Sequence, residues 1–369
     1  MGPSPIQRTY RLTYRKYFSR GIAVSNIRVD PDAKPFGLPA RKQGDNMATD
    51  AVRRRLMLAA LGLFALPAGA QPDYPARPVK LVVSLPPGSG ADSTARFIAQ
   101  KLAAKLGQPF VVENRPGGNG FIGARAVADA APDGYTLFVG SNSTMVTNAV
   151  LFTNPPYDPV NGFAPVERLA RFAMVVVVPA NSPYKALGGL IGALRTAPGK
   201  LNYAAGSPTY QIYTELLNER FHVRANPIAY KGTAPAMTDV AAGHVDYAIG
   251  EISAVLPLIR AGRVRPLAVT APQRLKDLPQ VPTVAESGAP GFDVAAWTGV
   301  FAPSKVPAQI VNVLSAAVRE AMQQPDSVKF ITGLGGEVYL GGPQHFRQFQ
   351  LAEIERTRDI VKRAAIQIE

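Results

Sequence analysis

The chain has 369 residues, no cysteine, and 40 lysine and arginine residues against 26 aspartate and glutamate residues, a net charge of +14. The absence of cysteine excludes a disulfide framework and a thiolate nucleophile. The three histidines, His222, His244 and His345, do not have the spacing of metal ligands, so the sequence indicates no metal site.

The first predicted element is a secretory signal peptide over residues 47–70. Three arginines at 53–55 precede an apolar run at 56–66, and the small residues at 68–70 form a cleavage site. The apolar run is too short to span a bilayer. The paired arginines leave both the general secretory route and the twin-arginine route open. We therefore expect export across the cytoplasmic membrane, a mature chain beginning at Gln71, and no membrane insertion of that mature chain.

Residues 1–46 precede Met47, where a signal peptide would start, and we interpret them as an upstream extension from a misassigned start codon. The alternative is a basic tail that binds a partner. Residues 1–70 hold 12 basic and 4 acidic residues, which leaves 28 against 22 in the mature chain. The remaining charge of +6 is scattered along the sequence. It therefore does not indicate nucleic-acid binding, although it favours anionic small ligands.

A glycine-rich turn is the most informative segment of the mature chain. The turn at 86–90 joins a predicted strand at 79–84 to a predicted helix at 92–106. Such a turn exposes backbone N–H groups that the helix cannot use, and the helix dipole adds positive potential at the same point. It can bind an anion without any charged side chain. The alternative is an ordinary strand–helix loop in which Asp92 only caps its helix.

Short β-branched runs alternate with helical segments along the rest of the mature chain. This alternation predicts an α/β fold with mostly parallel sheets, and a mature length of about 300 residues suits two domains. Strands are predicted at residues 110–113, 136–140, 173–178, 247–250, 267–270 and 298–302, and helices at residues 120–130, 186–195, 211–220, 234–242, 307–323 and 343–364.

Further polar turns that contain glycine could present hydrogen-bond donors at the carboxyl edges of the sheets. They lie at residues 140–144, 205–210, 230–234 and 250–253. Each turn by itself is more often an ordinary connection. Together with the turn at 86–90, they form a set of donors without a nucleophile or a metal, which is typical of ligand binding in an open α/β sheet.

Two enzymatic interpretations compete with ligand binding. Residues 118–123 match G-x-G-x-x-G, but no acidic residue lies about 20 residues further on, which argues against a dinucleotide site. The G-x-S-x-G elbow of many hydrolases is absent. Ser89 does lie between two glycines, but the sequence offers no histidine with a clear carboxylate partner to activate it. An exported hydrolase therefore remains the alternative function.

Several ordered motifs extend over the whole mature chain. They are YPARPV at 74–79, PPGSGAD at 86–92, ENRPGGNG at 113–120, PDGYT at 132–136, YKGTAPA at 230–236, LPQVPTVAESG at 278–288 and WTGVFAP at 297–303. In these motifs the chain resembles the Bug-type extracytoplasmic solute receptors of tripartite tricarboxylate transporters. The resemblance covers nearly all of residues 74–365.

The resemblance implies an α/β, two-lobed fold of the type II periplasmic-binding-protein class. Each lobe would be a mostly parallel sheet flanked by helices, and two crossing hinge strands would let the lobes close on a ligand. One lobe would combine residues 71–172 with 297–369, and the other would hold residues 173–296. The crossings are expected near Arg171–Pro179 and Phe292–Ala302.

The resemblance also implies that the ligand is a small carboxylate, held largely by backbone donors and ordered waters. In this interpretation Asp92 orients a water or a ligand amine, and Lys231 supplies positive charge. Carried over by position, the candidate ligand-binding residues are Pro87, Gly88, Ser89, Gly90, Asp92, Ser141, Asn142, Thr144, Ser207, Thr209, Tyr210 and Lys231.

We therefore expect a periplasmic receptor, not an enzyme, that captures a small carboxylate between two lobes. It would deliver the ligand to membrane permease subunits or signal its presence to a partner. No cofactor, metal or nucleic-acid partner is expected. The alternative is an exported hydrolase acting on a small carboxylate ester.

Overall fold

The computed structural model describes residues 74–367 of the chain. The predicted signal peptide at 47–70, the upstream extension at 1–46 and the expected mature N-terminus at Gln71 lie outside the described residues. Among the helices of the described part, none combines the length and the apolar character needed to cross a membrane.

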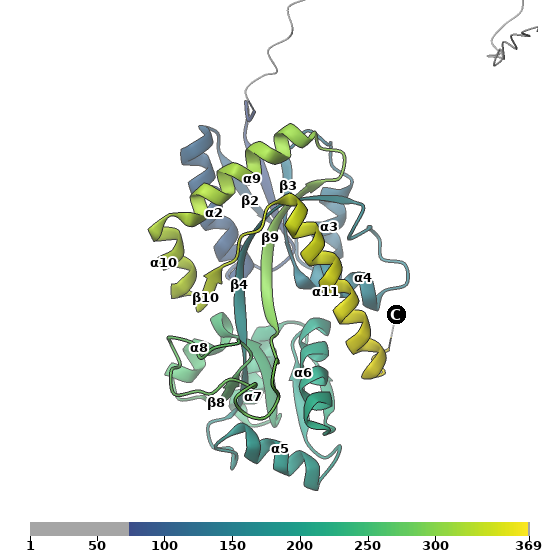
Figure 1. The fold of residues 1–369 in the computed structure, drawn as a ribbon, viewed down its shortest axis with the longest axis vertical. Coiled ribbons are helices and arrows are strands. Elements are labelled where there is room, and N and C mark those ends of the chain that lie inside the picture. Colours follow the sequence, from purple (N-terminus) through teal and green to yellow (C-terminus); the bar gives the residue numbers. More distant parts are fainter. Residues whose placement is uncertain (1–73, 368–369) are drawn as a thin grey trace, which may run out of the picture. The chain divides into compact units, whose positions relative to one another are not determined.

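The first lobe is built on a mixed sheet whose outer part is parallel (Figure 1). Strand β1 pairs in parallel with β2 and with β3, so that Val83 lies opposite both Asn114 and Val139. Strand β9 then pairs antiparallel with β3, and β4 pairs antiparallel with β9. The strands follow the order β2 (Phe110–Asn114), β1 (Val79–Val83), β3 (Thr136–Ser141), β9 (Ala295–Pro303) and β4 (Phe163–Pro179), with β10 (Gly336–Val338) also pairing with β4.

Helices cover both faces of this sheet. The chain moves from β1 outward to β2 and then back past β1 to β3, so right-handed connections place α2 and α3 on opposite faces. Helix α2 packs against α9, whereas Phe346 of α11 contacts Phe301 and Trp297. The helical elements are α2 (Gly90–Leu106), η1 (Gly118–Gly120), α3 (Phe121–Ala128), η2 (Ser143–Thr147), α4 (Asn148–Leu151), α9 (Ala308–Gln323), α10 (Pro325–Gly333) and α11 (Pro343–Arg363).

The second lobe repeats this layered plan on a shorter sheet. Strand β5 pairs in parallel with β6 and with β7, and the buried rings of Tyr203 and Tyr247 lie opposite each other. Strands β7 and β8 pair antiparallel with the end of β4. The elements are α5 (Leu187–Thr196), β5 (Asn202–Ala205), α6 (Pro208–Phe221), β6 (Asn226–Ala229), α7 (Thr233–Ala242), β7 (Tyr247–Glu251), α8 (Ile252–Arg260) and β8 (Val264–Val269).

Strands β4 and β9 join the two lobes (Figure 1). The first part of the 17-residue strand β4 pairs with β9, from Phe163 opposite Pro303 to Ala173 opposite Ala295. From Met174 onward, β4 pairs instead with β7 and β8 of the second lobe. One continuous strand therefore belongs to both sheets. Any rotation of one lobe against the other has to be absorbed in β4 and β9.

Every strand predicted from the sequence is present among the described residues, and each predicted helix overlaps an observed one. The prediction does not reveal the first half of β4, where Pro165 and the charged Glu167 interrupt the apolar pattern at a register shift. It also does not reveal β6, which is exposed and contains Pro227. Helix α8 carries Pro257 in its interior, where proline normally ends a helix.

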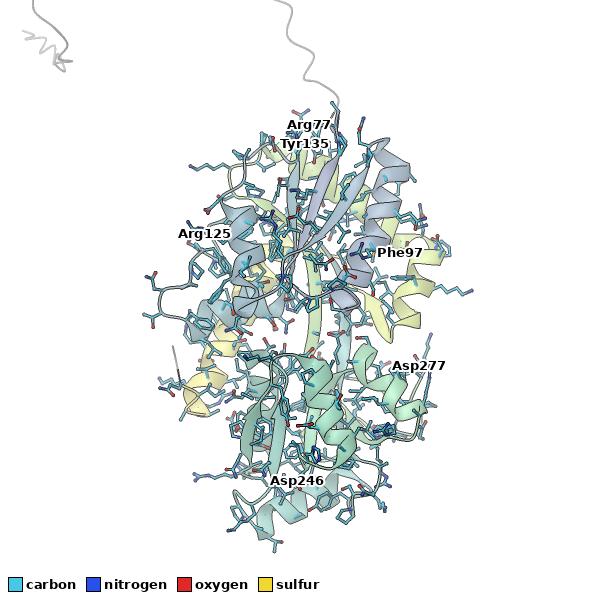
Figure 2. All side chains as sticks on the ribbon, turned by 180° about the vertical axis from the view of Figure 1, so that it is seen from behind. Arg77, Phe97, Arg125, Tyr135, Asp246 and Asp277 are labelled. Atoms are coloured by element: carbon cyan, nitrogen blue, oxygen red, sulfur yellow. The ribbon has the colours of Figure 1, made fainter. Side chains whose placement is uncertain are left out.

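Charged side chains lie at the outer ends of both lobes (Figure 2). In the first lobe the guanidinium of Arg77 lies 3.9 Å from the ring centroid of Tyr135 and forms an ion pair of 2.8 Å with Asp133. In the second lobe the carboxylate of Asp246 accepts a hydrogen bond of 2.7 Å from the amide of Asn202. The region where the lobes meet lies between these two ends.

A buried carboxylate fastens the C-terminal segment of the chain to β4. Glu167 is fully buried, and its Oε2 atom accepts hydrogen bonds of 2.8 and 3.1 Å from Arg319 of α9. Its Oε1 atom accepts a hydrogen bond of 2.5 Å from the amide of Gly341, just before α11. Both oxygens of Glu167 are therefore occupied. Arg319 is its cationic partner, so removing Arg319 would leave a buried charge without its counter-ion.

We expect Arg319→Met to lower the free energy of unfolding by about 3 kcal/mol, because the fully buried carboxylate of Glu167 loses its half-exposed counter-ion. Urea denaturation measures this loss. The matched control is Arg358→Met on α11, whose ion pair with Glu355 is exposed on both sides. This control should cost less than about 1 kcal/mol. Equal losses in the two variants would contradict the structural role of Glu167.

Candidate ligand-binding site

The turn between β1 and α2 differs from the sequence prediction in how its helix begins. Helix α2 begins at Gly90, and its N-cap is Ser89, whose hydroxyl accepts a hydrogen bond of 3.2 Å from the amide of Asp92. The sequence analysis began the helix at Asp92, and its alternative interpretation made that residue the cap; both are wrong. Asp92 is the third helical residue, and the hydroxyl of Ser89 is the group placed to satisfy an amide of the first turn.

Asp92 instead holds the shape of the turn from inside. Its carboxylate is buried and accepts hydrogen bonds of 2.9 Å from the amide of Gly88, 2.9 Å from Asn114 and 3.1 Å from Arg96. Burial alone would raise the pKa of Asp92, but these hydrogen bonds and the Arg96 guanidinium hold that pKa below its usual range. Asp92 is therefore ionised at neutral pH and fully engaged within the first lobe.

Two backbone amides at the start of α2 are left free. The amides of Asp92 and Ser93 donate to the side chain and the carbonyl of Ser89. Within the described residues, the amides of Gly90 and Ala91 donate to no acceptor. Free amides at the N-terminus of a 17-residue helix lie at the positive end of its dipole, so they are suited to an anionic group.

Two buried hydroxyls lie near the same end of the sheet. Ser141 and Thr298 are 8% and 5% exposed and lie directly opposite each other in the β3–β9 register. Ser84 faces Gly123 of α3, and the neighbouring residue Val83 pairs with Val139. By alternation, Ser141 and Thr298 lie on the other face of the sheet, which α2 covers. Neither hydroxyl has a hydrogen-bond partner within the described residues.

Hydroxyl and amide groups of the two lobes contact each other beside this site. The hydroxyl of Thr209 in the second lobe lies 3.0 Å from that of Ser143 and 2.8 Å from that of Thr147. The side-chain amide of Asn142 donates a hydrogen bond of 2.9 Å to the hydroxyl of Tyr213. Asn142 and Thr209, which the sequence analysis named as ligand-binding residues, are thus engaged in contacts between the lobes.

The remaining predicted residues divide into engaged and accessible groups. The hydroxyl of Thr144 bonds to the backbone of Ser141, and the hydroxyl of Ser207 caps α6. Pro87, Gly88 and Lys231 are exposed, and Gly88 has a positive φ of 83° that favours glycine. The structure therefore brings the turn at 86–90 and the β3 end together, and leaves Lys231 at the surface.

Glu251 is the prominent acidic group that the list of predicted site residues lacks. It ends β7, and a Cβ atom added to Gly90 of the first lobe would lie only 2.7 Å from its Oε1 atom. Oε1 also accepts a hydrogen bond from the hydroxyl of Ser253. The turn at 250–253 is visible in the sequence as a polar turn after a strand, but nothing in the sequence shows that it faces α2.

The environment of Glu251 disfavours its charged form. Burial raises the pKa of the Glu251 carboxyl, although the hydroxyls of Ser253 and the nearby Tyr210 oppose this effect. The same burial, together with the charge of Glu251, raises the pKa of Tyr210 well above its ordinary value. No lysine, arginine or histidine of the described part forms an ion pair with Glu251. The interface between the lobes thus contains an acidic group without a cation.

The arrangement offers groups that can form hydrogen bonds with a small polar molecule. Free amides, hydroxyls and one carboxyl meet between the lobes, and no group of three or more acidic or histidine side chains in the described residues could hold a metal ion. Such groups can bind and orient a small polar molecule.

Comparisons with known proteins identify the class of this protein. A family model described as the tripartite tricarboxylate transporter family receptor matches residues 94–366. The BugT protein of Bordetella pertussis is 34% identical over 321 residues, which cover 85% of this chain and 98% of BugT. The chain therefore belongs to the tripartite tricarboxylate transporter receptor family, and the resemblance to Bug-type receptors is confirmed.

Solved structures of similar proteins share the fold. Rpa4515 of Rhodopseudomonas palustris, solved with adipate, is 36% identical with a TM-score of 0.75, over 80% of this chain and 99% of that protein. MatC of the same organism, solved with bound malate, is 35% identical with a TM-score of 0.71, over 78% of this chain and 100% of MatC. The prediction of a two-lobed periplasmic-binding-protein fold is confirmed.

We expect the pH dependence of stability to report the environment of Glu251. A carboxyl with a raised pKa binds its proton more tightly in the folded chain than in the unfolded one. The free energy of unfolding therefore falls as the pH rises from 4.5, the ordinary pKa of a glutamate, through the raised pKa of Glu251 in the folded chain. Glu251→Gln should remove this fall. Urea denaturation across this pH range measures the difference between variant and wild type.

The control residue for this experiment is Glu286, whose pKa shift has the opposite sign to that of Glu251. Hydrogen bonding from the amide of Thr283, followed by that from Arg274, lowers the pKa of Glu286. Glu286 therefore contributes stability above its unfolded pKa that is lost as pH falls through the folded one, and Glu286→Gln should remove that contribution. If Glu251→Gln left the pH profile unchanged, the carboxyl of Glu251 would not be desolvated in the folded protein.

Proposed function

We propose that this chain is an extracytoplasmic receptor that binds a small carboxylate between its two lobes. The observation that carries the proposal is the pair of free amides of Gly90 and Ala91 at the N-terminus of α2, at the edge where the second lobe approaches. Two amides and a helix dipole compensate a carboxylate without a charged side chain. The adipate and malate in the related structures are ligands of this chemical class.

The proposed roles of the site residues follow from their contacts. Gly90 and Ala91 bind the carboxylate, and Ser141 and Thr298 bind a second polar group or an ordered water through their free hydroxyls. For Lys231, which is exposed in the turn before α7, the proposed role is to add positive charge. The other predicted residues position these groups or join the lobes: Pro87, Gly88, Ser89, Asp92, Asn142, Thr144, Ser207, Thr209 and Tyr210.

The organisation of the whole chain is part of the proposal. We place one lobe in residues 71–172 with 297–369 and the other in residues 173–296, in keeping with the change of partners along β4. The receptor works in the periplasm after removal of the signal peptide at 47–70. Family membership supports membrane permease subunits as the partners that receive the ligand.

A hydrolase is not favoured by the geometry around Ser89. Its hydroxyl accepts a hydrogen bond from the amide of Asp92 as a helix cap. No histidine of the described part forms a hydrogen bond with this hydroxyl, and His244 pairs with Asp239 at an exposed position of the second lobe. A serine without a base lacks the activation that nucleophilic catalysis requires.

A thermal-shift screen tests the proposed function directly. The chain from residue 71 onward is heated in the presence of mono-, di- and tricarboxylates and amino acids. A ligand present at about 100 times its dissociation constant should add about 2.7 kcal/mol to the free energy of unfolding. A carboxylate ester that is turned over, with the turnover abolished by Ser89→Ala, would instead establish the hydrolase.

We expect Gly90→Val to abolish carboxylate binding and to leave folding intact. The new side chain would occupy the space between the free amides and Glu251, while Gly90 has an ordinary helical position that accepts a side chain. Isothermal titration calorimetry with the ligand found in the screen measures the affinity. The matched control is Gly188→Val in the first turn of α5, where an added Cβ meets nothing within 4 Å. Unaltered affinity in the Gly90 variant would refute the proposed site.

A further inference from the structure

The two buried carboxylates of the first lobe each have a cationic partner, whereas Glu251 of the second lobe has none among the described residues. Asp92 is paired with Arg96 at 3.0 Å, and Glu167 is paired with Arg319 at 2.8 Å. A carboxylate removed from water is normally compensated by a cation of this kind. Glu251 is half-buried, and it has only hydroxyl neighbours, Ser253 and Tyr210, and no cation of the described part beside it.

Glu251, which has no cation of the described part beside it, lies next to the place where we propose that the ligand binds. Oε1 of Glu251 faces Gly90 across the boundary between the lobes, next to the free amides of Gly90 and Ala91. A carboxylate bound to those amides would lie close to the carboxylate of Glu251. Two carboxylates repel each other at short range, and the repulsion is strong where water is excluded. A plain carboxylate ligand would therefore pay a cost that its binding groups do not offset.

A cation on the ligand removes this conflict. An ammonium group has three N–H donors and a positive charge, so it can donate to Glu251 while the carboxylate of the same molecule accepts from the amides of α2. The hydroxyl of Ser253 holds Oε1 of Glu251 in a fixed direction. A carboxylate has about four lone-pair sites on its two oxygens, so Glu251 can accept a further hydrogen bond beside those from Ser253 and Tyr210.

We propose that Glu251 determines ligand specificity by selecting, among small carboxylates, those that also carry an ammonium group. This inference rests on the proposed function, because it assumes that a carboxylate binds at the start of α2. It assigns the ligand to the class of amino acids and other amino-carboxylates. The turn at 250–253 then supplies the acidic half of a site whose anion-binding half is the turn at 86–90.

The experiment compares matched ligands that differ only in an ammonium group. The pairs are succinate and aspartate, glutarate and glutamate, and butyrate and 4-aminobutyrate. Dissociation constants are measured by calorimetry for the full chain, for Glu251→Gln, which keeps the shape and removes the charge, and for Glu251→Asp, which keeps the charge. The control variant is Glu286→Gln, an exposed glutamate paired with Arg274 in the same lobe.

We expect the wild type to prefer the ammonium-bearing member of at least one pair by about tenfold or more, which corresponds to a hydrogen bond between charged groups. Glu251→Gln should reduce this preference by at least about tenfold, since the neutral amide no longer balances the ammonium charge. Glu251→Asp should retain part of it, and Glu286→Gln should retain all of it. Thermal unfolding without ligand verifies that each variant is folded.

The outcomes separate the inference from the proposed function. If both members of a pair bind and Glu251→Gln leaves their ratio unchanged, the inference is overturned and the receptor function stands. The same holds if succinate binds more tightly as pH falls while aspartate is excluded, because Glu251 would then donate a proton to a second carboxylate. If none of the probes, nor any carboxylate of the thermal-shift screen, binds to the wild type, the proposed function itself fails.

Discussion

The start of helix α2 is the constraint on which the rest of the structure depends. Within the described part of the chain, the amides of Gly90 and Ala91 are free there, while the neighbouring backbone amides of the turn and the first helical turn donate hydrogen bonds. Asp92, buried and paired with Arg96, ties the turn to β2 through Asn114, and Ser89 caps the helix. The amides are therefore preorganised, and a ligand carboxylate does not have to order the turn when it binds. Loss of this order would displace the amides of Gly90 and Ala91, which we propose as the binding groups.

The contacts between the lobes suit a protein that opens and closes. Beside the two hinge strands, the lobes contact each other through hydroxyl and amide pairs such as Thr209 with Thr147 and Asn142 with Tyr213. Single hydrogen bonds of this kind contribute only about 1 kcal/mol each, because water replaces them when the lobes separate. Helix α11 also packs against α6 of the second lobe, where Arg363 forms an ion pair of 2.6 Å with Glu219. A ligand that bridges the two lobes adds the interactions that hold the closed form.

Glu251, the acidic group opposite the start of α2, has no cationic partner among the described residues. A desolvated Glu251 without a cation is unfavourable in the empty protein, and its raised pKa reflects that cost. Proteins tolerate such groups where they serve binding. In the second lobe, Glu251 thus stands in contrast to Glu167 in the first, which has both oxygens occupied and serves only to hold the chain together. The two glutamates differ because the fold itself supplies both partners of Glu167, whereas Glu251 lies at the boundary between the lobes, where we propose that a ligand supplies the cation.

The sequence by itself determined the alternating α/β order, the receptor family and the glycine-rich strand–helix turn at 86–90. These properties depend on local patterns: apolar periodicity, glycine in a strand–helix turn, and ordered motifs. Only the tertiary structure decided that β4 extends back to Phe163 in the first lobe, that Asp92, Asn142 and Thr209 are engaged within the protein, and that Glu251 faces Gly90. Residues 90 and 251 lie far apart along the chain, and no local pattern encodes which turns meet. That meeting is set by strand order and by the packing of one lobe against the other.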